Sequence, residues 1–260
     1  MVTIRRILER LARGSITIDE AETLLKPTMI KEVEHIARLD IGREIRTGIP
    51  EIILAEGKTP GDVVKIASRL LKEGNRVVIS RCDKNHIRSI RETFRDAKIR
   101  IDTKARMAVV ESREHQPLVR EGMIGLMTAG TSDIPVAEEA KFTAEEAGCK
   151  VLAAYDVGVA GLHRVFSPLK TMIKEGVGAI IVVAGMEGAL PSVIAGLVDI
   201  PVIGVPTSSG YGLGGKGIGA LISMLQSCSL GLAVVNIDNG VAAGVMAALI
   251  ARRAKEASGD

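Results

Sequence analysis

The sequence predicts an α/β protein with two domains, and the second domain is expected to hold a parallel sheet with helices on both faces. From Gly122 onward, five short apolar runs alternate with longer stretches of helical pattern. This is the pattern of strands that are buried on both sides and joined by crossover helices. Each run is followed by a turn of small residues, and such turns gather along one rim of a parallel sheet. The residues before Gly122 carry more charge and predict a smaller α/β domain.

The polar link from Glu111 to Glu121 separates the two domains, which we place at residues 1–118 and 119–260. In the first domain we expect helices at 3–13, 17–26, 60–73 and 83–95, and strands at 33–39, 51–55, 77–80, 99–103 and 106–111. In the second we expect strands at 124–128, 151–155, 179–184, 201–205 and 232–237. Its helices are expected at 134–147, 162–175, 189–197, 217–229 and 240–257.

Composition excludes several classes of function. The 260 residues are 47% hydrophobic and 25% charged, as in a globular protein with a large core. Aromatic residues make up only 2% and basic residues alternate with acidic ones, which argues against nucleic acid as a partner. The apolar runs are too short to cross a membrane. Three well-separated cysteines form no disulfide framework, which favours a cytoplasmic location.

Cys228 is the strongest candidate nucleophile. It lies between a helical pattern and the apolar run that begins at Leu232. A thiol is a strong nucleophile, and ligands gather at strand ends in α/β folds. Against this, free cysteine is among the most buried residue types and often acts only as a small hydrophobe. The residue alone leaves both interpretations open.

Two of the small-residue turns have the chemistry of a ligand site. Gly130, Thr131, Ser132 and Asp133 lie between a strand and a helix, where amides and hydroxyls are able to hold a phosphate or carboxylate. The alternative is that Ser132 or Asp133 only caps the helix. Glu187 lies in a similar turn, either as a charge favoured by the helix dipole or as a polar group that faces a pocket.

Two glycine-containing segments imitate nucleotide-binding motifs. Residues 210–217 match GxGxxG twice, but so glycine-rich a tract matches by chance, and it follows the fourth strand of its domain rather than the first. We therefore favour a flexible or ligand-closing loop over a dinucleotide fingerprint. Lys58 and Thr59 imitate the end of a P-loop, but Ile52 stands where that loop requires glycine, so we reject nucleotide hydrolysis there.

These segments together resemble the LarB family over most of the chain, and the second half is also similar to PurE, the aminoimidazole ribonucleotide carboxylase or mutase. The resemblance is carried by Leu39-Asp40 with Arg43 and Arg46, and by residues 48–51, 55–59, 128–133, 158–164, 185–191, 206–212 and 235–240. It implies a PurE-like parallel sheet of the flavodoxin or Rossmann kind for the C-terminal domain. PurE carries a histidine just before its Leu-Pro pair, whereas this chain has Ala189 there, which favours LarB.

The resemblance implies an activity. LarB proteins are pyridinium-3,5-biscarboxylic acid mononucleotide synthases, which catalyse the first step of nickel-pincer nucleotide synthesis. They carboxylate C5 of the pyridinium ring of nicotinic acid adenine dinucleotide and hydrolyse its phosphoanhydride with release of AMP. The expected co-substrate is CO2 or bicarbonate, the expected metal is Mg²⁺, and the expected assembly is a homo-octamer.

By the same resemblance, Cys228 adds to C4 of the ring and so makes C5 nucleophilic. The other roles are hypotheses. Glu187 and Asp133 take the C5 proton or orient water. The turn of Gly130, Thr131, Ser132 and Asp133 holds the nucleotide, and Ser208, Ser209 and Gly210 bind phosphate or carboxylate. Lys58 and Arg46 neutralise the anions of the substrate.

Alternatives stay open for both function and assembly. A PurE-type carboxylase would not need Cys228, and a non-catalytic nucleotide-binding module would use the glycine-rich rim only to bind. The last helix is rich in alanine and glycine from Val241 to Ile250. It packs either against a neighbouring chain or on its own sheet.

Overall fold

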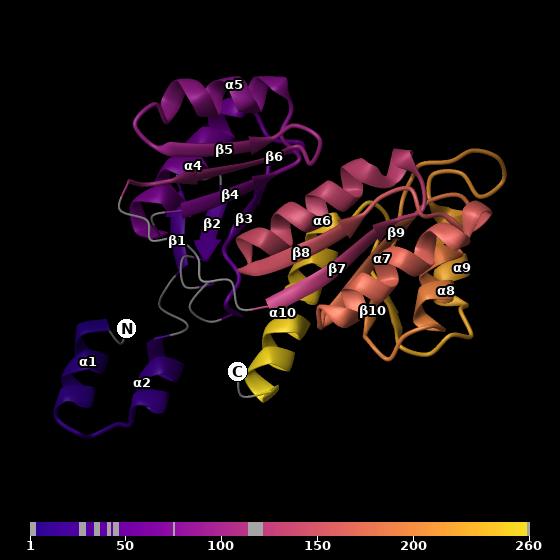
Figure 1. Ribbon diagram of the computed structural model, residues 1–260. Helices are drawn as coiled ribbons and strands as arrows, with labels where there is room; N and C mark the ends of the chain where they lie inside the picture. The colour runs from indigo at the N-terminus through magenta and orange to yellow at the C-terminus, as the bar shows by residue number, and fades with distance from the viewer. Residues whose placement is uncertain are drawn as a thin grey trace. The chain divides into compact units, whose positions relative to one another are not determined.

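The computed structural model describes residues 4–25, 30–33, 37–40, 43, 47–74, 76–113 and 122–258. The chain divides into two compact units. One comprises Met1–Arg100 and Ala108–His115, and the other comprises Ile101–Met107 and Gln116–Asp260. In Figure 1 most of the first unit is coloured indigo to purple, and the second runs from pink to yellow.

A pair of helices and a hairpin begin the described chain. Helices α1 (Ile4–Ala12) and α2 (Ile18–Leu25) share a small apolar cluster that contains Ile7 and Ala21. Strands β1 (Ile30–Val33) and β2 (Ala37–Asp40) are antiparallel, and Val33 pairs with Ala37. The expected single strand at 33–39 is therefore wrong. Between the two strands the sequence has no glycine, proline or asparagine to indicate a turn, so it did not separate them.

A mixed four-stranded sheet follows, in the order β3-β4-β6-β5. Its strands are β3 (Ile52–Leu54), β4 (Arg76–Ser80), β5 (Lys98–Asp102) and β6 (Met107–Glu111), and its helices are α4 (Pro60–Gly74) and α5 (Lys84–Thr93). β4 is parallel to β3 and antiparallel to β6. Thr59 accepts a hydrogen bond from the Asp62 amide and so caps α4, the helix that Pro60 begins.

The second unit contains a five-stranded sheet in which every pairing is parallel, as predicted. Its strands are β7 (Gly122–Thr128), β8 (Cys149–Ala154), β9 (Ala179–Ala184), β10 (Val202–Pro206) and β11 (Leu232–Val234). They lie in the order β11-β10-β9-β7-β8, which is the 2-1-3-4-5 order of flavodoxin-like folds. The strand order reverses between β7 and β9, and folds of this kind bind ligands at that switch point.

Five helices flank this sheet: α6 (Ile134–Glu146), α7 (His163–Lys174), α8 (Leu190–Ala195), α9 (Ile218–Leu225) and α10 (Gly240–Ser258). Every residue of β9 and β10 is buried, as expected for central strands covered on both faces. The helices agree with the predicted ranges except α9, which ends at Leu225 rather than near 229. No helix of the described residues combines the length and apolarity that a membrane crossing requires.

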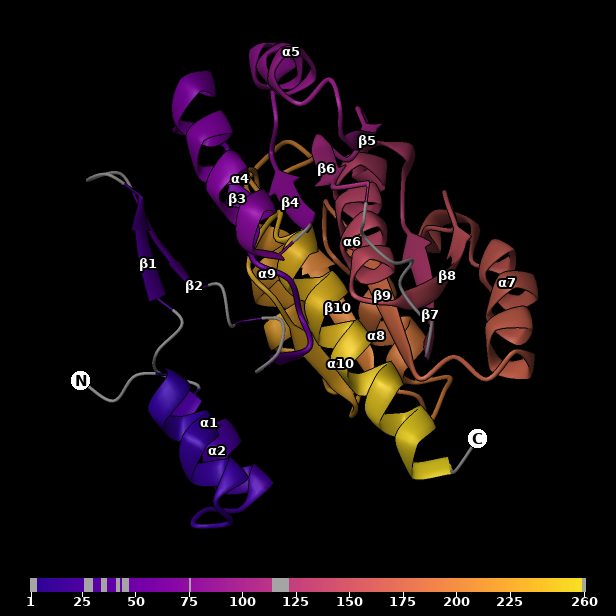
Figure 2. The same ribbon diagram turned by 90° about the vertical axis from the view of Figure 1, so that its left-hand side faces the viewer.

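The last helix, α10, packs on its own domain. It lies alongside α6, as Figure 2 shows, and Ala243, Ala247 and Ala248 are fully buried. A Cβ added at Gly244 would lie 2.5 Å from the carbonyl oxygen of Ala140, so only glycine permits this approach. The buried carboxylate of Glu139 accepts a hydrogen bond of 3.0 Å from the Gly240 amide, at the first residue of α10. The small residues of this helix therefore serve a close contact within one chain.

Candidate functional site

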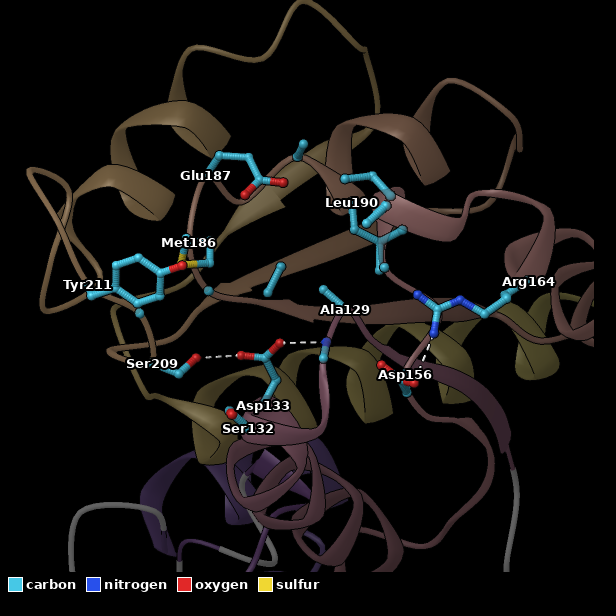
Figure 3. Close-up of a pocket in the computed structure, with 18 residues that line it drawn as sticks. Ala129, Ser132, Asp133, Asp156, Arg164, Met186, Glu187, Leu190, Ser209 and Tyr211 are labelled. Carbon is cyan, nitrogen blue, oxygen red and sulfur yellow. Dashed lines mark hydrogen bonds and ion pairs between the residues drawn. The ribbon is translucent and has the colours of Figure 1, made fainter.

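A cavity of about 470 Å³ opens at the carboxyl ends of the parallel strands (Figure 3). Its volume is within the range of pockets that hold small ligands. Its walls come from the turns after β7, β8, β9 and β10, on both sides of the switch point between β7 and β9. The residues that line it are Ala129, Gly130, Ser132, Asp133, Asp156, Gly158, Val159, Ala160, Arg164, Ala184, Gly185, Met186, Glu187, Ala189, Leu190, Ser209, Gly210 and Tyr211.

Asp133 is the most firmly held polar group of this pocket. The residue is only 3% exposed. Its Oδ1 accepts hydrogen bonds from the hydroxyls of Thr207 and Ser209, both at 2.7 Å, and its Oδ2 accepts one from the Gly130 amide at 2.9 Å. The carboxylate makes no capping bond to α6, so the interpretation of Asp133 as a simple cap is wrong. Asp133 instead joins the turns after β7 and β10.

Gly185 makes room for this hydroxyl and carboxylate cluster. A Cβ built on Gly185 would lie 2.4 Å from both the carbonyl oxygen and the Oγ of Ser209, and 2.7 Å from Oγ1 of Thr207. Real Cβ atoms do not approach other atoms so closely. The glycine after β9 therefore belongs to the same arrangement as Asp133, although it forms none of its hydrogen bonds.

The turn after β8 supplies an ion pair at the pocket wall. Nη1 of Arg164 lies 2.8 Å from Oδ2 of Asp156, and Nε of Arg164 donates to the carbonyl oxygen of Gly161 at 3.3 Å. Figure 3 shows the guanidinium beside Asp156, across the pocket from Tyr211. A guanidinium with one edge paired retains N–H groups on its other edges, which suit an oxyanion.

Non-glycine residues with left-handed backbone shape two of the turns. Asp156 has φ of 57° after β8, and Met186 has φ of 51° after β9. Such conformations are costly for residues with a side chain and persist only where the surroundings impose them. Thr128, which is fully buried, supplies that constraint at Asp156: its Oγ1 accepts from the Asp156 amide and its carbonyl oxygen from the Val157 amide, both at 2.9 Å.

The charged side chains of the pocket are mainly acidic. Its lining contains the carboxylates of Asp133, Asp156 and Glu187 against the single guanidinium of Arg164. Figure 3 shows Glu187 and Asp133 on opposite sides of the pocket. This balance favours a ligand with a positively charged part, together with at least one anionic group that Arg164 is able to hold.

The structure brings six of the predicted site residues together at the pocket: Gly130, Ser132, Asp133, Glu187, Ser209 and Gly210. Thr131 and Ser208 belong to the same turns but do not line it. Thr131 is exposed, and the amide of Ser208 donates to Oδ1 of Asp238 at 2.8 Å. The glycine-rich tract contributes Gly210 and Tyr211 to the wall of the pocket.

Cys228 lies elsewhere in the same domain. It follows α9 and precedes β11, and the carbonyl oxygen of Gly231 in this segment accepts from the amide of Val202, the first residue of β10. This segment thus enters the sheet at the amino ends of the strands, whereas the pocket lies at their carboxyl ends. Cys228 is exposed, unlike the buried Cys82 and Cys149, so it is not the small core hydrophobe of the alternative interpretation.

Two predicted site residues belong to the N-terminal part of the chain. The ammonium of Lys58 donates to the carbonyl oxygen of Leu54 at 2.7 Å, within the turn that precedes α4. Arg46 lies outside the residues that the structure describes. The anion-neutralising role of both side chains stays a prediction.

Sequence reasoning gave no role to Asp156, Arg164 or Thr207. The signal for Asp156 was present, because it directly follows a predicted strand, where α/β folds place ligand groups. Arg164 comes eight residues later in the first turn of α7, and no spacing rule connects it to that rim. Thr207 is buried and acts through Asp133, a relation that only the folded chain reveals.

The described residues contain no group of three or more His, Cys, Asp or Glu side chains arranged to hold a metal ion. A protein cage for a transition metal is therefore missing from them. Mg²⁺ needs no such cage, because it keeps several waters and is commonly held by substrate phosphates with one or two carboxylates. Glu187 and Asp156 at the pocket are carboxylates of that kind.

Comparison with known proteins agrees with this fold and pocket. Residues 123–258 match the family described as AIR carboxylase, which makes the second domain a PurE-like domain of the carboxylase and mutase class. Residues 30–113 match the LarB/PurE-like N-terminal domain. With both domains matched in order, the chain belongs to the LarB family, with a PurE-like C-terminal domain.

Individual relatives show the same division. The chain is 46% identical over 254 residues to an uncharacterized protein of Methanocaldococcus jannaschii, MJ0165, and the match spans 96% of this chain and 97% of that protein. It is 33% identical over 144 residues to the N5-carboxyaminoimidazole ribonucleotide mutase of Pyrococcus horikoshii, covering 54% of this chain and 75% of the mutase. The corresponding mutase of Thermotoga maritima is 31% identical over 132 residues.

Proposed function

We propose that this protein is a pyridinium-3,5-biscarboxylic acid mononucleotide synthase. It carboxylates C5 of the pyridinium ring of nicotinic acid adenine dinucleotide with CO2 or bicarbonate and hydrolyses the phosphoanhydride, giving AMP. Membership of the LarB family supports the proposal, and the reduced thiol that the reaction uses suits a cytoplasmic setting.

The acidic balance of the pocket is the observation that carries the proposal. Three carboxylates against one guanidinium favour a ligand that carries positive charge. The ring nitrogen of a pyridinium nucleotide is cationic, whereas the aminoimidazole ring of a PurE substrate is neutral, and both substrates carry anionic phosphate. The pocket charge therefore supports a pyridinium nucleotide over an aminoimidazole ribonucleotide.

Ala189 adds a second argument against the PurE reaction. It stands at the position before Leu190-Pro191 where PurE proteins carry a histidine, and it lines the pocket. A methyl group transfers no proton, so this wall lacks the imidazole that PurE proteins carry here. The carboxylates of Glu187 and Asp133 remain as candidates to accept a proton in this chain.

The expected chemistry divides a difficult carboxylation into easier steps. The thiolate of Cys228 forms a C–S bond at C4, which neutralises the ring and leaves C5 as an enamine carbon. C5 then forms a C–C bond with CO2, its proton leaves to a base, and departure of the thiolate restores the aromatic pyridinium. Of the two candidate bases, Glu187 is exposed, whereas Asp133 is buried. The oxygens of Asp133 also accept three hydrogen bonds already, which makes Glu187 the better candidate.

Because Cys228 does not line the pocket of its own chain, we propose that the thiol acts in the pocket of a second copy within the expected homo-octamer. Exposed apolar residues flank it in the sequence: Leu225 is 64% exposed and Leu230 is 90% exposed. Apolar surface of this kind typically marks a contact with another chain. Mg²⁺ bound to the phosphates would stabilise the charge that develops during hydrolysis of the phosphoanhydride.

Product analysis tests the proposed reaction. Purified protein is incubated with nicotinic acid adenine dinucleotide, bicarbonate and Mg²⁺ and examined by mass spectrometry, for the wild type and for Cys228→Ser. We expect AMP and a dicarboxylated pyridinium mononucleotide from the wild type only. Unchanged dinucleotide in both samples would refute the proposal, and the carboxyaminoimidazole ribonucleotide would then be tried as substrate, followed by binding without turnover.

Mixed oligomers test the shared site. Cys228→Ser and Asp133→Asn are each expected to be inactive alone, because one lacks the nucleophile and the other alters the pocket. When the two variants are dissociated together and reassembled, chains with an intact pocket receive an intact thiol from a neighbour. Recovered activity supports thiol donation between copies, and no recovery in verified mixed oligomers contradicts it.

A further inference from the structure

The ion pair between Arg164 and Asp156 has a consequence for the charge of the group that binds there. Both residues line the pocket, and their closest atoms are 2.8 Å apart. The side chains are 37% and 50% exposed, so water and a ligand reach both partners. An anion that approaches the guanidinium therefore meets the neighbouring carboxylate as well.

We propose that Asp156 is a specificity-determining residue that lowers the preference of the Arg164 subsite for dianions over oxyanions with a single negative charge. The attraction of Arg164 for an anion and the repulsion by Asp156 both grow with the charge of the ligand. A carboxylate, or a phosphate within a phosphodiester or phosphoanhydride, loses less to the repulsion than a phosphomonoester dianion does. The remaining guanidinium N–H groups suit the two oxygens of such a monoanion.

The backbone around Asp156 supports a built arrangement rather than a chance surface pair. Its left-handed φ of 57° is held by the two hydrogen bonds to the buried Thr128. The side chain of Arg164 is oriented by its hydrogen bond to the carbonyl oxygen of Gly161. A Cβ added at Gly161 would lie 2.7 Å from Nε of Arg164, so the glycine also makes room for this side chain. Both residues of the ion pair are thus held by hydrogen bonds to nearby residues, in addition to their contact with each other.

This inference has a consequence for turnover that rests on the proposed function. In the dinucleotide each phosphate of the anhydride carries a single charge. Hydrolysis converts both phosphates to monoesters, whose charge at neutral pH is about −1.5 to −2. Because Asp156 weakens the binding of dianions more than that of monoanions, it lowers the affinity for both products relative to the reactant and so promotes product release.

The test replaces Asp156 by asparagine, which removes the charge, keeps the shape and tolerates left-handed backbone. Three simple anions are titrated at pH about 8 by ligand-observed proton and phosphorus NMR: benzoate, dimethyl phosphate and inorganic phosphate. If the ion pair acts by charge, affinity for the two monoanions rises about fivefold in Asp156→Asn, and affinity for the phosphate dianion rises by roughly the square of that factor. Benzoate and dimethyl phosphate show which kind of monoanion the subsite prefers.

Two further variants complete the test. Asp156→Gly adopts the same backbone without strain and should behave as Asp156→Asn does, which guards against a folding artefact. Arg164→Gln should abolish binding of all three anions, which locates them at this subsite. Weaker binding of every anion in Asp156→Asn would show that Asp156 merely holds Arg164 in place, and equal gains for monoanions and dianion would also overturn the inference. These titrations need no turnover, so failure of the proposed reaction leaves their result intact.

Discussion

At the scale of single residues, the Asp133 carboxylate accounts for much of the order in the pocket. It receives three hydrogen bonds from two turns that are far apart in sequence. A buried carboxylate is tolerated only when such bonds replace its hydration. The residues that bond to Asp133 are therefore expected to matter for stability as well as for the shape of the site.

Thr207→Val should lower the free energy of unfolding by about 1–3 kcal/mol, because it leaves a buried carboxylate oxygen short of a donor while keeping the side-chain shape. Thr207 is 1% exposed, so water does not readily replace the lost hydroxyl. Urea denaturation measures the difference. Thr131→Val is the matched control, since Thr131 is exposed in the same rim, and it should change the free energy by less than about 0.5 kcal/mol. Equal effects at both positions would contradict this account.

Among the cysteines, only Cys228 should react quickly with iodoacetamide in the folded protein. Cys82 and Cys149 are buried, and burial raises the pKa of the Cys149 thiol, which lowers its thiolate fraction further. Peptide mass spectrometry after brief alkylation at neutral pH identifies the modified residue. Early modification of Cys149 or Cys82 would show that the domain opens more readily than its packing indicates.

At the scale of elements, the contact between α6 and α10 depends on the absence of side-chain atoms. Gly244 allows the two helices to approach until a Cβ would overlap the Ala140 carbonyl oxygen. Here packing outweighs the low helix propensity of glycine. Replacement of glycine by alanine should therefore lower stability at a crowded helical position and raise it at an open one.

Gly244→Ala should destabilise the protein by about 1–3 kcal/mol, because the added methyl forces the helices apart. Gly61→Ala in α4 is the control: the nearest atom to a Cβ there lies 3.9 Å away, so alanine should stabilise by about 0.5–1 kcal/mol through its helix propensity. Thermal or urea unfolding of both variants shows whether each change lowers or raises the free energy of unfolding. A stabilised Gly244→Ala would mean that α6 and α10 are not in close contact.

The sequence predicted the elements of the C-terminal domain well, because long apolar strands and small-residue turns alternate there without ambiguity. It failed at residues 30–40, where two antiparallel strands follow one another with no glycine, proline or asparagine between them to indicate a turn. For the site, Asp133 and Glu187 were found in turns that follow strands, whereas Asp156 was missed although it directly follows a predicted strand. Thr207 and Arg164 were also missed, because their roles depend on side-chain contacts that no local pattern encodes.

At the scale of the whole molecule, the exposed apolar side chains of α9 point to assembly. Ile218 and Ile222 are each 51% exposed and Leu225 is 64% exposed, at the spacing of one helix face. Monomeric proteins seldom expose a contiguous apolar stripe of this kind. The proposed homo-octamer gives this face a partner, namely a second copy of the chain.

Ile222→Glu should therefore lower the molar mass measured by light scattering during gel filtration, because a charge buried at a contact between copies is costly. Activity on the dinucleotide should fall in parallel if Cys228 serves a neighbouring pocket. Lys170→Glu, at an exposed position of α7, should leave the molar mass unchanged. An Ile222→Glu protein of unaltered mass would place the contact on another face.

The left-handed turns at Asp156 and Met186 bear on how this chain responds to selection. Glycine at either position would relieve backbone strain and raise the melting temperature, since each such residue stores about 1–3 kcal/mol. Selection for higher thermal stability would therefore favour substitutions in the turns that shape the rim of the pocket. Variants with substitutions there are expected to have a higher melting temperature but a lower catalytic efficiency. The rim should therefore be left unchanged when the protein is engineered for thermal stability.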